Sequence, residues 1–282
     1  MLSRGNTSDV YAIGVDAVVK VPRPEVPDHW VHMEARHAVA VHAAGLPAPR
    51  VLDVMEVDGR AAIVFERVDG PSMLERLVAA PGEAPQLARE MASMQQEILA
   101  CPAPPELMAL GDRVVRKVAT ACRVEAGDRV VAGELLDRLP SGSAVCHGDL
   151  HPGNILLAEA GPVVIDWFDA CAGPPIADVV RSSIIVRPLR STGTSPPHLC
   201  GVRTDVLDEF HTTYLECMFG ELDLDADVAL AWEAVLALSR LAEPLGPEID
   251  DLVSIWRSRA DLSGAPTTAL AEMLLAGGGS EQ

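Results

Sequence analysis

Two polar motifs near the middle of the chain restrict its fold more than any other stretch. The first is CHGDLHPGN at residues 146–154, and the second is VVIDWFD at residues 163–169. The apolar residues between them predict a β-hairpin over residues 155–165. Since a hairpin brings its two ends together, we expect the two motifs to lie side by side.

The two histidines of the first motif do not predict a zinc site. His147 and His151 are four residues apart, a spacing that binds one metal only when both rings lie on one helix face. Gly148, Pro152 and Gly153 surround them, and Pro152 would remove a helical hydrogen bond. The sequence also lacks a G-x-S-x-G elbow and a Walker A loop, which argues against a serine hydrolase and a P-loop protein.

The two motifs instead supply the side chains that phosphoryl transfer requires. Asp149 can orient a hydroxyl group and accept its proton, while Asn154 and Asp166 offer oxygen atoms that suit Mg²⁺. Asp and Asn are also common in turns, so a turn role is the alternative for Asp149 and Asn154. Two observations favour function. The chain has only two asparagines, Asn6 and Asn154, and the second aspartate follows at the required distance.

The stretch HGDLHPGN…VIDWFDACAGPPIADVVR resembles the aminoglycoside phosphotransferase family of kinase-fold small-molecule kinases. That family has Gly where protein kinases have Arg in H-R-D, an I-D-W or I-D-F motif, and a D-x-x-R further on. The resemblance covers the chain from about residue 4 to about residue 190. It implies an α+β fold of two lobes, like that of protein kinases, with a small sheet-plus-helix N-lobe and a larger, mainly helical C-lobe.

The resemblance also implies which residues bind the nucleotide. RGNTSDVY (4–11) would cover the phosphates with its backbone N–H groups, although it contains only one glycine. Lys20 would contact the α- and β-phosphates with Glu34 paired to it, and FERVDG (65–70) would be the hinge that meets adenine. The implied nucleotide-binding residues are Gly5, Asn6, Thr7, Ser8, Lys20, Glu34, Glu66 and Val68.

Asp149 is accordingly the predicted catalytic residue, with Asn154 and Asp166 as the predicted Mg²⁺ ligands. Other polar residues near the motifs receive supporting roles: His147 as a structural hydrogen-bonding residue, Asp178 as a brace for the catalytic loop, and His151 and Asp169 as candidate substrate contacts.

The lysines point to the same site. The chain has 20 arginines but only two lysines, Lys20 and Lys117. Because a compact ammonium fits where a guanidinium does not, a lysine within a strand indicates a function for Lys20 rather than a place on the surface. Lys117 is predicted on an exposed helix surface. Glu34 alone is a weak signal, since charges on such a helix are usually solvated.

Local patterns place the boundary between the lobes near Gly70, giving an N-lobe of residues 1–69 and a C-lobe of residues 70–282. The N-lobe is predicted to hold strands at 8–14, 17–21 and 50–68, the last a hairpin about Asp58-Gly59, and a helix at 29–45. Helices predicted in the C-lobe cover 72–80, 84–100, 106–125, 129–138, 203–220, 226–242, 247–260 and 265–276.

Charge suggests the kind of acceptor. The net charge is −19, and residues 203–282 hold 16 acidic against 4 basic residues. Such a surface would repel nucleic acid, which needs clustered cations. Acidity also serves solubility alone. The alternative is a cationic, hydroxyl-rich acceptor, and we expect an aminoglycoside or a related amino sugar.

The remaining composition predicts a cytoplasmic protein. No apolar run approaches the roughly 20 residues of a membrane span, and the N-terminus lacks the apolar core of a signal peptide. Six cysteines without regular spacing favour reduced thiols. The oligomeric state is left open.

Two alternatives to a small-molecule kinase remain. A protein kinase needs a longer segment than the 12 positions from Asp166 to Asp178, and usually has lysine where this chain has His151. A nucleotide-binding regulator without turnover would lack the base or a metal ligand, and neither is missing here. The sequence therefore favours transfer of the γ-phosphoryl group of ATP or GTP to a small hydroxylated acceptor.

Overall fold

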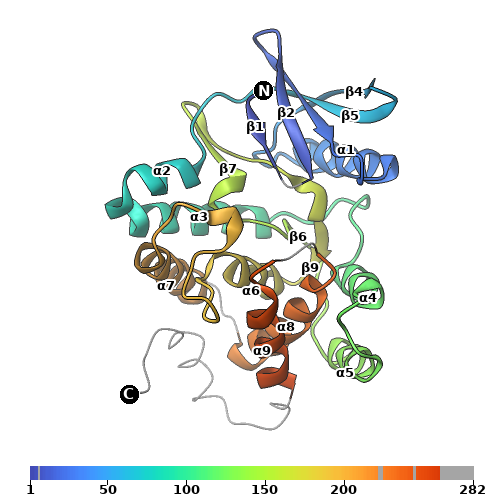
Figure 1. Cartoon of the computed structure of the whole chain (residues 1–282), viewed down its shortest axis with the longest axis vertical. Coiled ribbons are helices and arrows are strands. Elements are labelled where there is room, and N and C mark those ends of the chain that lie inside the picture. Colours follow the sequence, from blue (N-terminus) through green and yellow to red (C-terminus); the bar gives the residue numbers. More distant parts are fainter. Residues whose placement is uncertain (6, 222–224, 244–245, 261–282) are drawn as a thin grey trace.

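The N-terminal part of the chain forms a five-stranded antiparallel sheet against which one helix packs (Figure 1). The computed structural model describes residues 1–5, 7–221, 225–243 and 246–260. The strand order is β1-β2-β3-β5-β4. These elements are β1 (Ser3–Arg4), β2 (Ser8–Ile13), β3 (Ala17–Pro22), β4 (Val51–Val57), β5 (Arg60–Glu66) and helix α1 (Asp28–Ala43).

Both hairpins predicted in this part are present. β2 pairs with β3 along its whole length. Between β4 and β5, Val57 pairs with Arg60, and the two residues between them, Asp58 and Gly59, have φ angles of 50° and 77°. Two positive φ angles are the mark of a type I′ turn, whose twist matches that of the flanking strands.

Helix α1 covers one face of the sheet. Val31 and Ala35 of α1 are buried together with Ile63 of β5. Lys20 of β3 lies directly opposite Ile63 in the neighbouring strand, so its side chain leaves the same face of the sheet. The packing of α1 therefore brings the helix next to Lys20.

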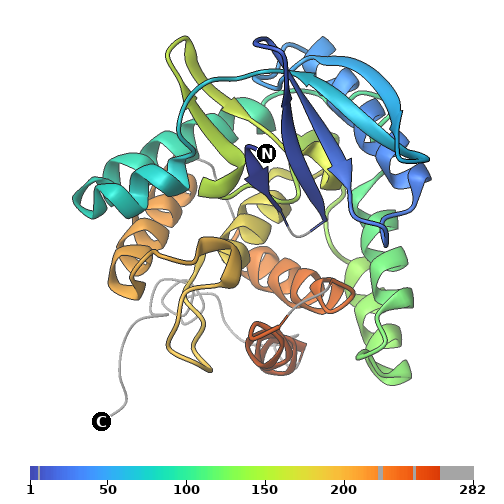
Figure 2. The ribbon, with the colours of Figure 1, turned by 45° about the horizontal axis from the view of Figure 1, so that its top comes forward.

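The rest of the chain is mainly helical and lies below the sheet in Figures 1 and 2. The predicted helix at 106–125 is shorter than expected, because the backbone turns extended at Ala121. The helix predicted at 265–276 lies outside the described residues. The helices are α2 (Met73–Ala79), α3 (Ala84–Leu99), α4 (Leu110–Thr120), α5 (Ala126–Leu136), α6 (Pro175–Val186), α7 (Thr204–Glu221), α8 (Ala226–Arg240) and α9 (Ile249–Ala260).

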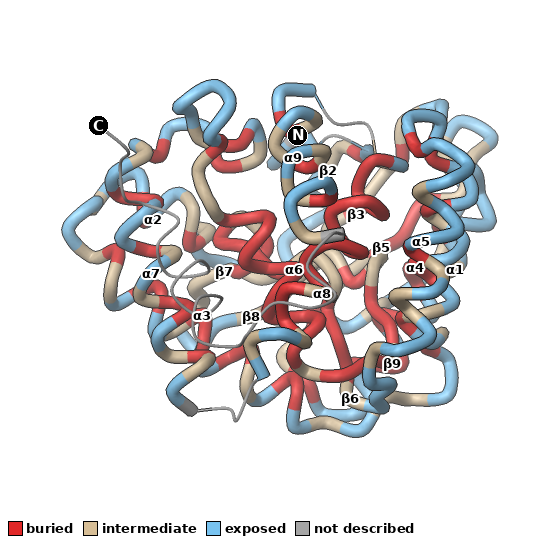
Figure 3. The backbone as a smooth tube through the Cα atoms, turned by 90° about the horizontal axis from the view of Figure 1, so that it is seen from below, coloured by how far each residue is buried: buried red, intermediate tan, exposed pale blue. Residues whose placement is uncertain are grey.

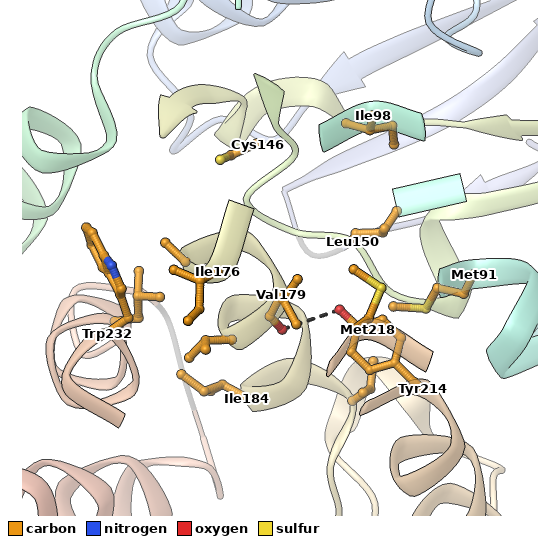
Figure 4. Packing of buried hydrophobic residues seen from close by; sticks show 14 of the residues in the cluster. Met91, Ile98, Cys146, Leu150, Ile176, Val179, Ile184, Tyr214, Met218 and Trp232 are labelled. Atoms are coloured by element: carbon orange, nitrogen blue, oxygen red, sulfur yellow. Dashed lines mark hydrogen bonds between the residues drawn. The ribbon is translucent and has the colours of Figure 1, made fainter. Parts of the chain in front are cut away.

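Helix α6 was not predicted, yet it lies at the centre of the helical part (Figure 3). Every residue from Ile176 to Val186 is buried. Figure 4 shows α6 between Trp232 of α8 and Tyr214 of α7, whose hydroxyl donates to the Val179 carbonyl at 3.3 Å. Polar residues of this helix, among them Asp178, Arg181 and Ser182, are buried as well, so no solvent-exposed polar face marks it.

Two small antiparallel sheets hold the polar motifs. Strand β6 (Ala144–Cys146) pairs with β9 (Cys171–Gly173), and β7 (Ile155–Ala158) pairs with β8 (Gly161–Val164). The second pair is the hairpin predicted over residues 155–165. Together the two sheets fix both ends of each motif.

The arrangement is the predicted α+β one, a sheet with one helix beside a larger helical part. The predicted boundary between residues 69 and 70 falls in the segment that joins β5 to α2. Among the described residues, no helix combines the length and the apolar character that crossing a membrane requires.

Candidate active site

Lys20 is held between two carboxylates from distant parts of the chain. Its Nζ lies 2.5 Å from Glu34 Oε1 on α1 and 3.1 Å from Asp166 Oδ1 in the second motif. Burial by itself would lower the pKa of Lys20, but the charges of Asp166 and Glu34 outweigh burial and raise it. Burial also raises the pKa of Glu34, an effect that Lys20 opposes. Lys20 is therefore a fixed cation at the boundary between the sheet and the helical part.

His147 connects the two polar motifs. Its side chain is fully buried, its Nε2 donates to the carbonyl of Ile165 at 3.1 Å, and its Nδ1 accepts from the N–H of Asp149 at 3.1 Å. The ring lies against that of Trp167, with centroids 4.6 Å apart. One imidazole thus joins the two motifs, and the predicted structural role of His147 is confirmed.

Gly148 turns the chain so that Asp149 faces outward. Its φ is +78°, and a Cβ at this position would lie 2.5 Å from the carbonyl oxygen of Asp169. The Gly148 N–H donates to Asp178 Oδ1 at 2.8 Å, and its carbonyl accepts from Arg181 Nε at 2.8 Å. Asp178 in turn accepts from Gln95 Nε2 at 2.9 Å. These contacts confirm the predicted bracing by Asp178.

Asn154 and Asp166 are oriented as oxygen donors. Asn154 Nδ2 donates to the backbone carbonyl of Asp149 at 2.9 Å, which leaves the amide oxygen for another partner. Asp166 has φ 64°, a left-handed conformation that costs a non-glycine residue about 1–3 kcal/mol and occurs mainly at functional sites. The N–H of Ile165, the residue before Asp166, donates to the Asn154 carbonyl at 2.9 Å. This hydrogen bond holds the backbone of Asn154 next to that of Asp166.

This oxygen donor set fits Mg²⁺. Mg²⁺ is commonly bound by one or two protein carboxylates and completed by substrate phosphates and water. Within the described ranges, no group of three or more His, Cys, Asp or Glu side chains could hold a metal by itself. A metal between Asn154 and Asp166 would have further oxygens from nucleotide phosphates and water as ligands.

Asp149 presents a charged carboxylate. Its side chain is 34% exposed, and His151 and Arg181 lower its pKa although burial acts in the opposite direction. His151 Nδ1 accepts from the Gly153 N–H at 3.0 Å, so its ring proton is on Nε2, which lies 3.9 Å from Asp149 Oδ2. Burial lowers the pKa of His151 to about 4. At neutral pH the site thus contains an ionised Asp149 beside a neutral imidazole.

A second charged group lies close to Asp149, whose Oδ1 is 3.9 Å from Arg181 Nη2. We call its five residues the polar cluster: Arg113, Lys117, Asp169, Arg181 and Glu243. Asp169 forms an ion pair with Arg113 and lies 3.3 Å from Lys117 Nζ and 3.8 Å from Arg181 Nη2. Glu243 lies 2.8 Å from both Lys117 and Arg181. The cluster joins α4, α6 and the segment that follows α8 to the second polar motif.

The position predicted for Lys117 is wrong. Helix α4 packs against α8, and this turns Lys117 toward Glu243 and Asp169 instead of solvent. Burial, together with the neighbouring charges of Arg181 and Arg113, lowers the pKa of Lys117 to about 8. Of the cluster, Arg181 had a signal in the D-x-x-R motif and Asp169 was a candidate substrate contact. Arg113 and Glu243 had no signal in the sequence.

Of the predicted nucleotide-covering residues, Gly5 and Thr7 lie between β1 and β2, Ser8 is the first residue of β2, and Asn6 lies outside the described residues. The Gly5 N–H donates to the Ser8 carbonyl at 2.8 Å, and Arg23 Nη2 donates to the Gly5 carbonyl at 2.7 Å. Their part in nucleotide binding stays a prediction.

The predicted hinge residues lie at the end of β5. Glu66 closes the strand and accepts from the Arg50 N–H at 2.8 Å, and Val68 follows it. The family resemblance is the only reason to expect that Glu66 and Val68 contact the nucleotide, and this role also stays a prediction.

The chain matches one family model in sequence and shares its fold with solved structures. Residues 2–195 match the model of a family described as the phosphotransferase enzyme family. No curated protein sequence matches the chain. A choline/ethanolamine kinase family protein from Mesorhizobium loti has the same fold, with TM-score 0.56 and 17% identity over 96% of this chain and 90% of that one.

Aminoglycoside phosphotransferases are also among the structural neighbours. A thermostable mutant in a ternary complex with ADP and hygromycin B has TM-score 0.61 and 18% identity, covering 99% of this chain and 94% of that one. The GDP complex of an aminoglycoside 2′-phosphotransferase has TM-score 0.53 and 16% identity, covering 93% and 92%. At these identities the structures establish the fold, which is the two-lobed kinase-like fold that the motifs predict.

The residues that match the family model extend well beyond the candidate active site. It includes the whole sheet, both polar motifs, α6 and the cations Arg113, Lys117 and Arg181. Since it spans more than two thirds of the 282 residues, this chain belongs to the phosphotransferase enzyme family.

Proposed function

We propose that this protein transfers the γ-phosphoryl group of a nucleoside triphosphate to a hydroxyl group of a small molecule. The observation that carries the proposal is the position of Lys20, which reaches from the sheet to Asp166. The neighbouring Ile165 is hydrogen-bonded to Asn154, and Asn154 to Asp149, so the four residues belong to one connected site. A fixed cation, two oxygen ligands and an ionised carboxylate are the parts that phosphoryl transfer needs in one place.

Asp149 acts on the acceptor. Its carboxylate accepts a hydrogen bond from the acceptor hydroxyl, orients the oxygen toward the γ-phosphorus, and takes the proton as the new P–O bond forms. Its low pKa keeps it ready to accept that proton at neutral pH. His147 and Gly148 fix the backbone around it, so placement supplies a large share of the rate.

Lys20 and the two oxygen ligands act on the donor. Lys20 binds phosphate oxygens through its ammonium group, and Glu34 keeps that group in place. Asn154 and Asp166 would hold Mg²⁺, which neutralises charge on the phosphates when bound. The neighbours bind ADP and GDP, which supports a nucleotide donor in general and leaves ATP and GTP as equal candidates.

The acceptor predicted from the sequence is cationic, and the hygromycin B complex of one neighbour supports an aminoglycoside. Three carboxylates of the last segment give it less support, because they already have partners. Glu243 binds Lys117 and Arg181, and Glu248 binds Arg240. Glu233 binds Arg187 and Arg259. The cytoplasmic location also stays a proposal, supported by the absence of disulfides among the six cysteines.

The test of this function separates binding from turnover. Thermal unfolding measured with ATP, GTP and their diphosphates should show stabilisation that increases with Mg²⁺. Lys20→Met should abolish that stabilisation, whereas Arg116→Met, at an exposed position of α4, should keep it. Nucleotide consumption is then screened over amino sugars, amino alcohols, hydroxy acids and a Ser/Thr peptide. Stabilisation by nucleotide without consumption under any condition would favour the regulator instead.

A further inference from the structure

The imidazole ring of His151 is held in one orientation. The residue is buried, and its Nδ1 accepts from the N–H of Gly153 at 3.0 Å. A Cβ at position 153 would lie 2.8 Å from His151 Cε1, so a glycine is needed where the ring lies against the backbone. The ring of His198 packs on it as well, with centroids 4.9 Å apart. These contacts fix both the position of the ring and the direction of its other nitrogen, Nε2.

His198 is itself fixed by residues from two other segments. It lies between α6 and α7, where its Nε2 is 3.1 Å from the carbonyl oxygen of Ile185 in α6. Its Nδ1 is 3.6 Å from Glu248 Oε1, and Glu248 also binds Arg240 of α8. The support behind His151 therefore comes from several helices of the C-terminal part, although His151 lies in the catalytic loop.

The Nε2 of His151 is a hydrogen-bond donor beside Asp149. Because Nδ1 accepts from Gly153, the ring proton is on Nε2. Among the described residues, no group accepts a hydrogen bond from this Nε2–H. Asp149 Oδ2 is 3.9 Å away, which is too far for a direct hydrogen bond. One oxygen atom placed between the two can accept from His151 and donate to Asp149.

The oxygen of an acceptor hydroxyl group has the groups that such a position requires. A hydroxyl group has one proton and two lone pairs. In phosphoryl transfer the proton goes to the base and one lone pair attacks phosphorus, which leaves the second lone pair for a donor. We propose that His151 is a second catalytic residue, whose Nε2–H donates to the acceptor oxygen while Asp149 accepts the proton of that oxygen. The proposal rests on the proposed phosphotransferase function.

The step then proceeds with His151 unchanged. The acceptor oxygen forms a bond to the γ-phosphorus, and the hydroxyl proton passes to Asp149. The bond from the γ-phosphorus to the bridging oxygen breaks, and its electron pair leaves with the nucleoside diphosphate. Negative charge develops on the acceptor oxygen as its proton leaves, and a fixed N–H stabilises that charge. The same donor selects hydroxyl groups, because a protonated amine has no lone pair with which to accept from His151.

The first test removes the ring. His151→Ala should lower kcat about 10- to 100-fold, the range expected for one lost hydrogen bond to a charged group. The affinity for ADP with Mg²⁺, measured by titration, should not change, because Lys20, Asn154 and Asp166 are kept. Turnover of ATP is measured with water and with glycerol as probe acceptors, and with any acceptor found in the nucleotide-consumption screen. The control is His32→Ala, exposed on α1, which should behave as wild type.

The second test restores the donor chemically. Imidazole added to His151→Ala can occupy the space of the missing ring and should recover part of the lost turnover. Its 1-methyl derivative has nearly the same size but no N–H when neutral, and should recover none. The assay is run at about pH 8.5, where both compounds are largely neutral. A ring that served packing alone would be replaced equally well by either compound. His32→Ala should not respond to imidazole.

A third pair of variants tests the support behind the ring. His198→Ala should lower kcat about 2- to 10-fold, as expected for the loss of one ring–ring contact. His198→Phe keeps a ring against His151 and should retain more turnover than His198→Ala. Both variants should keep the wild-type affinity for ADP, because His198 acts only through His151.

Wild-type turnover in His151→Ala would overturn the proposal, and so would equal recovery by the two imidazoles. Where neither compound restores turnover, His151→Gln and His151→Leu decide. These side chains are similar in size, but only Gln offers an N–H, so equal turnover of the two variants would also overturn the proposal. Failure of the wild-type protein to consume nucleotide under any condition would instead contradict the phosphotransferase function. The role of His151 can therefore fail while that function stands.

Discussion

The two lysines of this chain are both held by carboxylates near the polar motifs, and their surroundings differ in charge. Lys20 stands between two carboxylates, Glu34 and Asp166, which raise its pKa. Lys117 shares its carboxylates with two arginines, and its pKa falls to about 8. Lys20 is thus one cation between two carboxylates, whereas Arg113, Lys117 and Arg181 face the three carboxylates Asp149, Asp169 and Glu243. We call the surroundings of Lys20 the negative side and the polar cluster with its three cations the positive side.

This difference indicates what each side can receive. Carboxylates in excess favour an additional cation, as expected where a metal accompanies a nucleotide. On the positive side the charges balance, because its three cations face Asp149, Asp169 and Glu243. A single ionised carboxylate, Asp149, separates the two, and its Oδ1 faces Arg181 while its Oδ2 faces Asn154 and His151.

Removing the boundary between the two sides should have the largest effect. Asp149→Ala should lower turnover about 10²- to 10⁴-fold, the usual range for a general base. Nucleotide binding should stay close to the wild-type value, because Lys20 and the proposed metal ligands Asn154 and Asp166 are untouched. Steady-state kinetics and a nucleotide titration measure the two quantities. A variant that retains more than about a tenth of wild-type turnover would disprove the role of Asp149.

The positive side should depend on Glu243 for its stability. Arg181, Arg240 and Lys117 lower the pKa of Glu243 against the effect of burial. Glu243→Ala would leave these cations without their shared partner and should lower the free energy of unfolding by about 3 kcal/mol. Urea unfolding measures the change. Glu216→Ala, exposed on α7, is the control and should change stability by less than about 0.5 kcal/mol.

The negative side should tolerate no change of cation shape. Lys20→Arg keeps the charge, but a planar guanidinium cannot occupy the space between Glu34 and Asp166 as a compact ammonium does. We expect nucleotide affinity to fall about 10- to 100-fold, by isothermal titration. The matched control is Arg116→Lys on exposed α4. Affinity equal to that of the control would remove Lys20 from the nucleotide site.

The pH dependence of stability should distinguish the two lysines. Between about pH 8 and 10.5 the unfolded chain keeps the Lys117 proton that the folded chain has lost, so this residue makes stability rise with pH. This rise in the free energy of unfolding is at most about 3 kcal/mol. The charged groups that surround Lys117 are Arg113, Arg181, Asp169 and Glu243. Urea unfolding at several pH values should show a flatter profile for Lys117→Met than for wild type. Identical profiles would contradict the lowered pKa.

The sequence predicted the negative side better than the positive one for a physical reason. Asp149, Asn154 and Asp166 stand at fixed spacings around one hairpin, and a hairpin is a local structure that the sequence pattern reveals. Lys20 was singled out as a lysine within a strand. Each of these signals is visible within a short segment.

The positive side has no such local signal. Lys117 was misplaced because only the packing of α4 against α8 turns it inward, and Glu243 was one acid among many in an acidic segment. Helix α6, which supplies Arg181, escaped prediction because it is buried on every side. Three helices meet at this side, and pattern analysis of each one separately cannot reveal their contacts.

The ion pairs at the site also join residues that are far apart in the sequence. Lys20 and Asp166 are separated by 146 positions, and Lys117 and Glu243 by 126. Contacts of such separation form late, because the entropy of closing a long loop must be overcome first. During synthesis the nucleotide-side residues leave the ribosome well before Glu243 does. A growing chain can therefore complete the hairpin and the contact of Lys20 with Asp166 while the positive side still lacks its central acid.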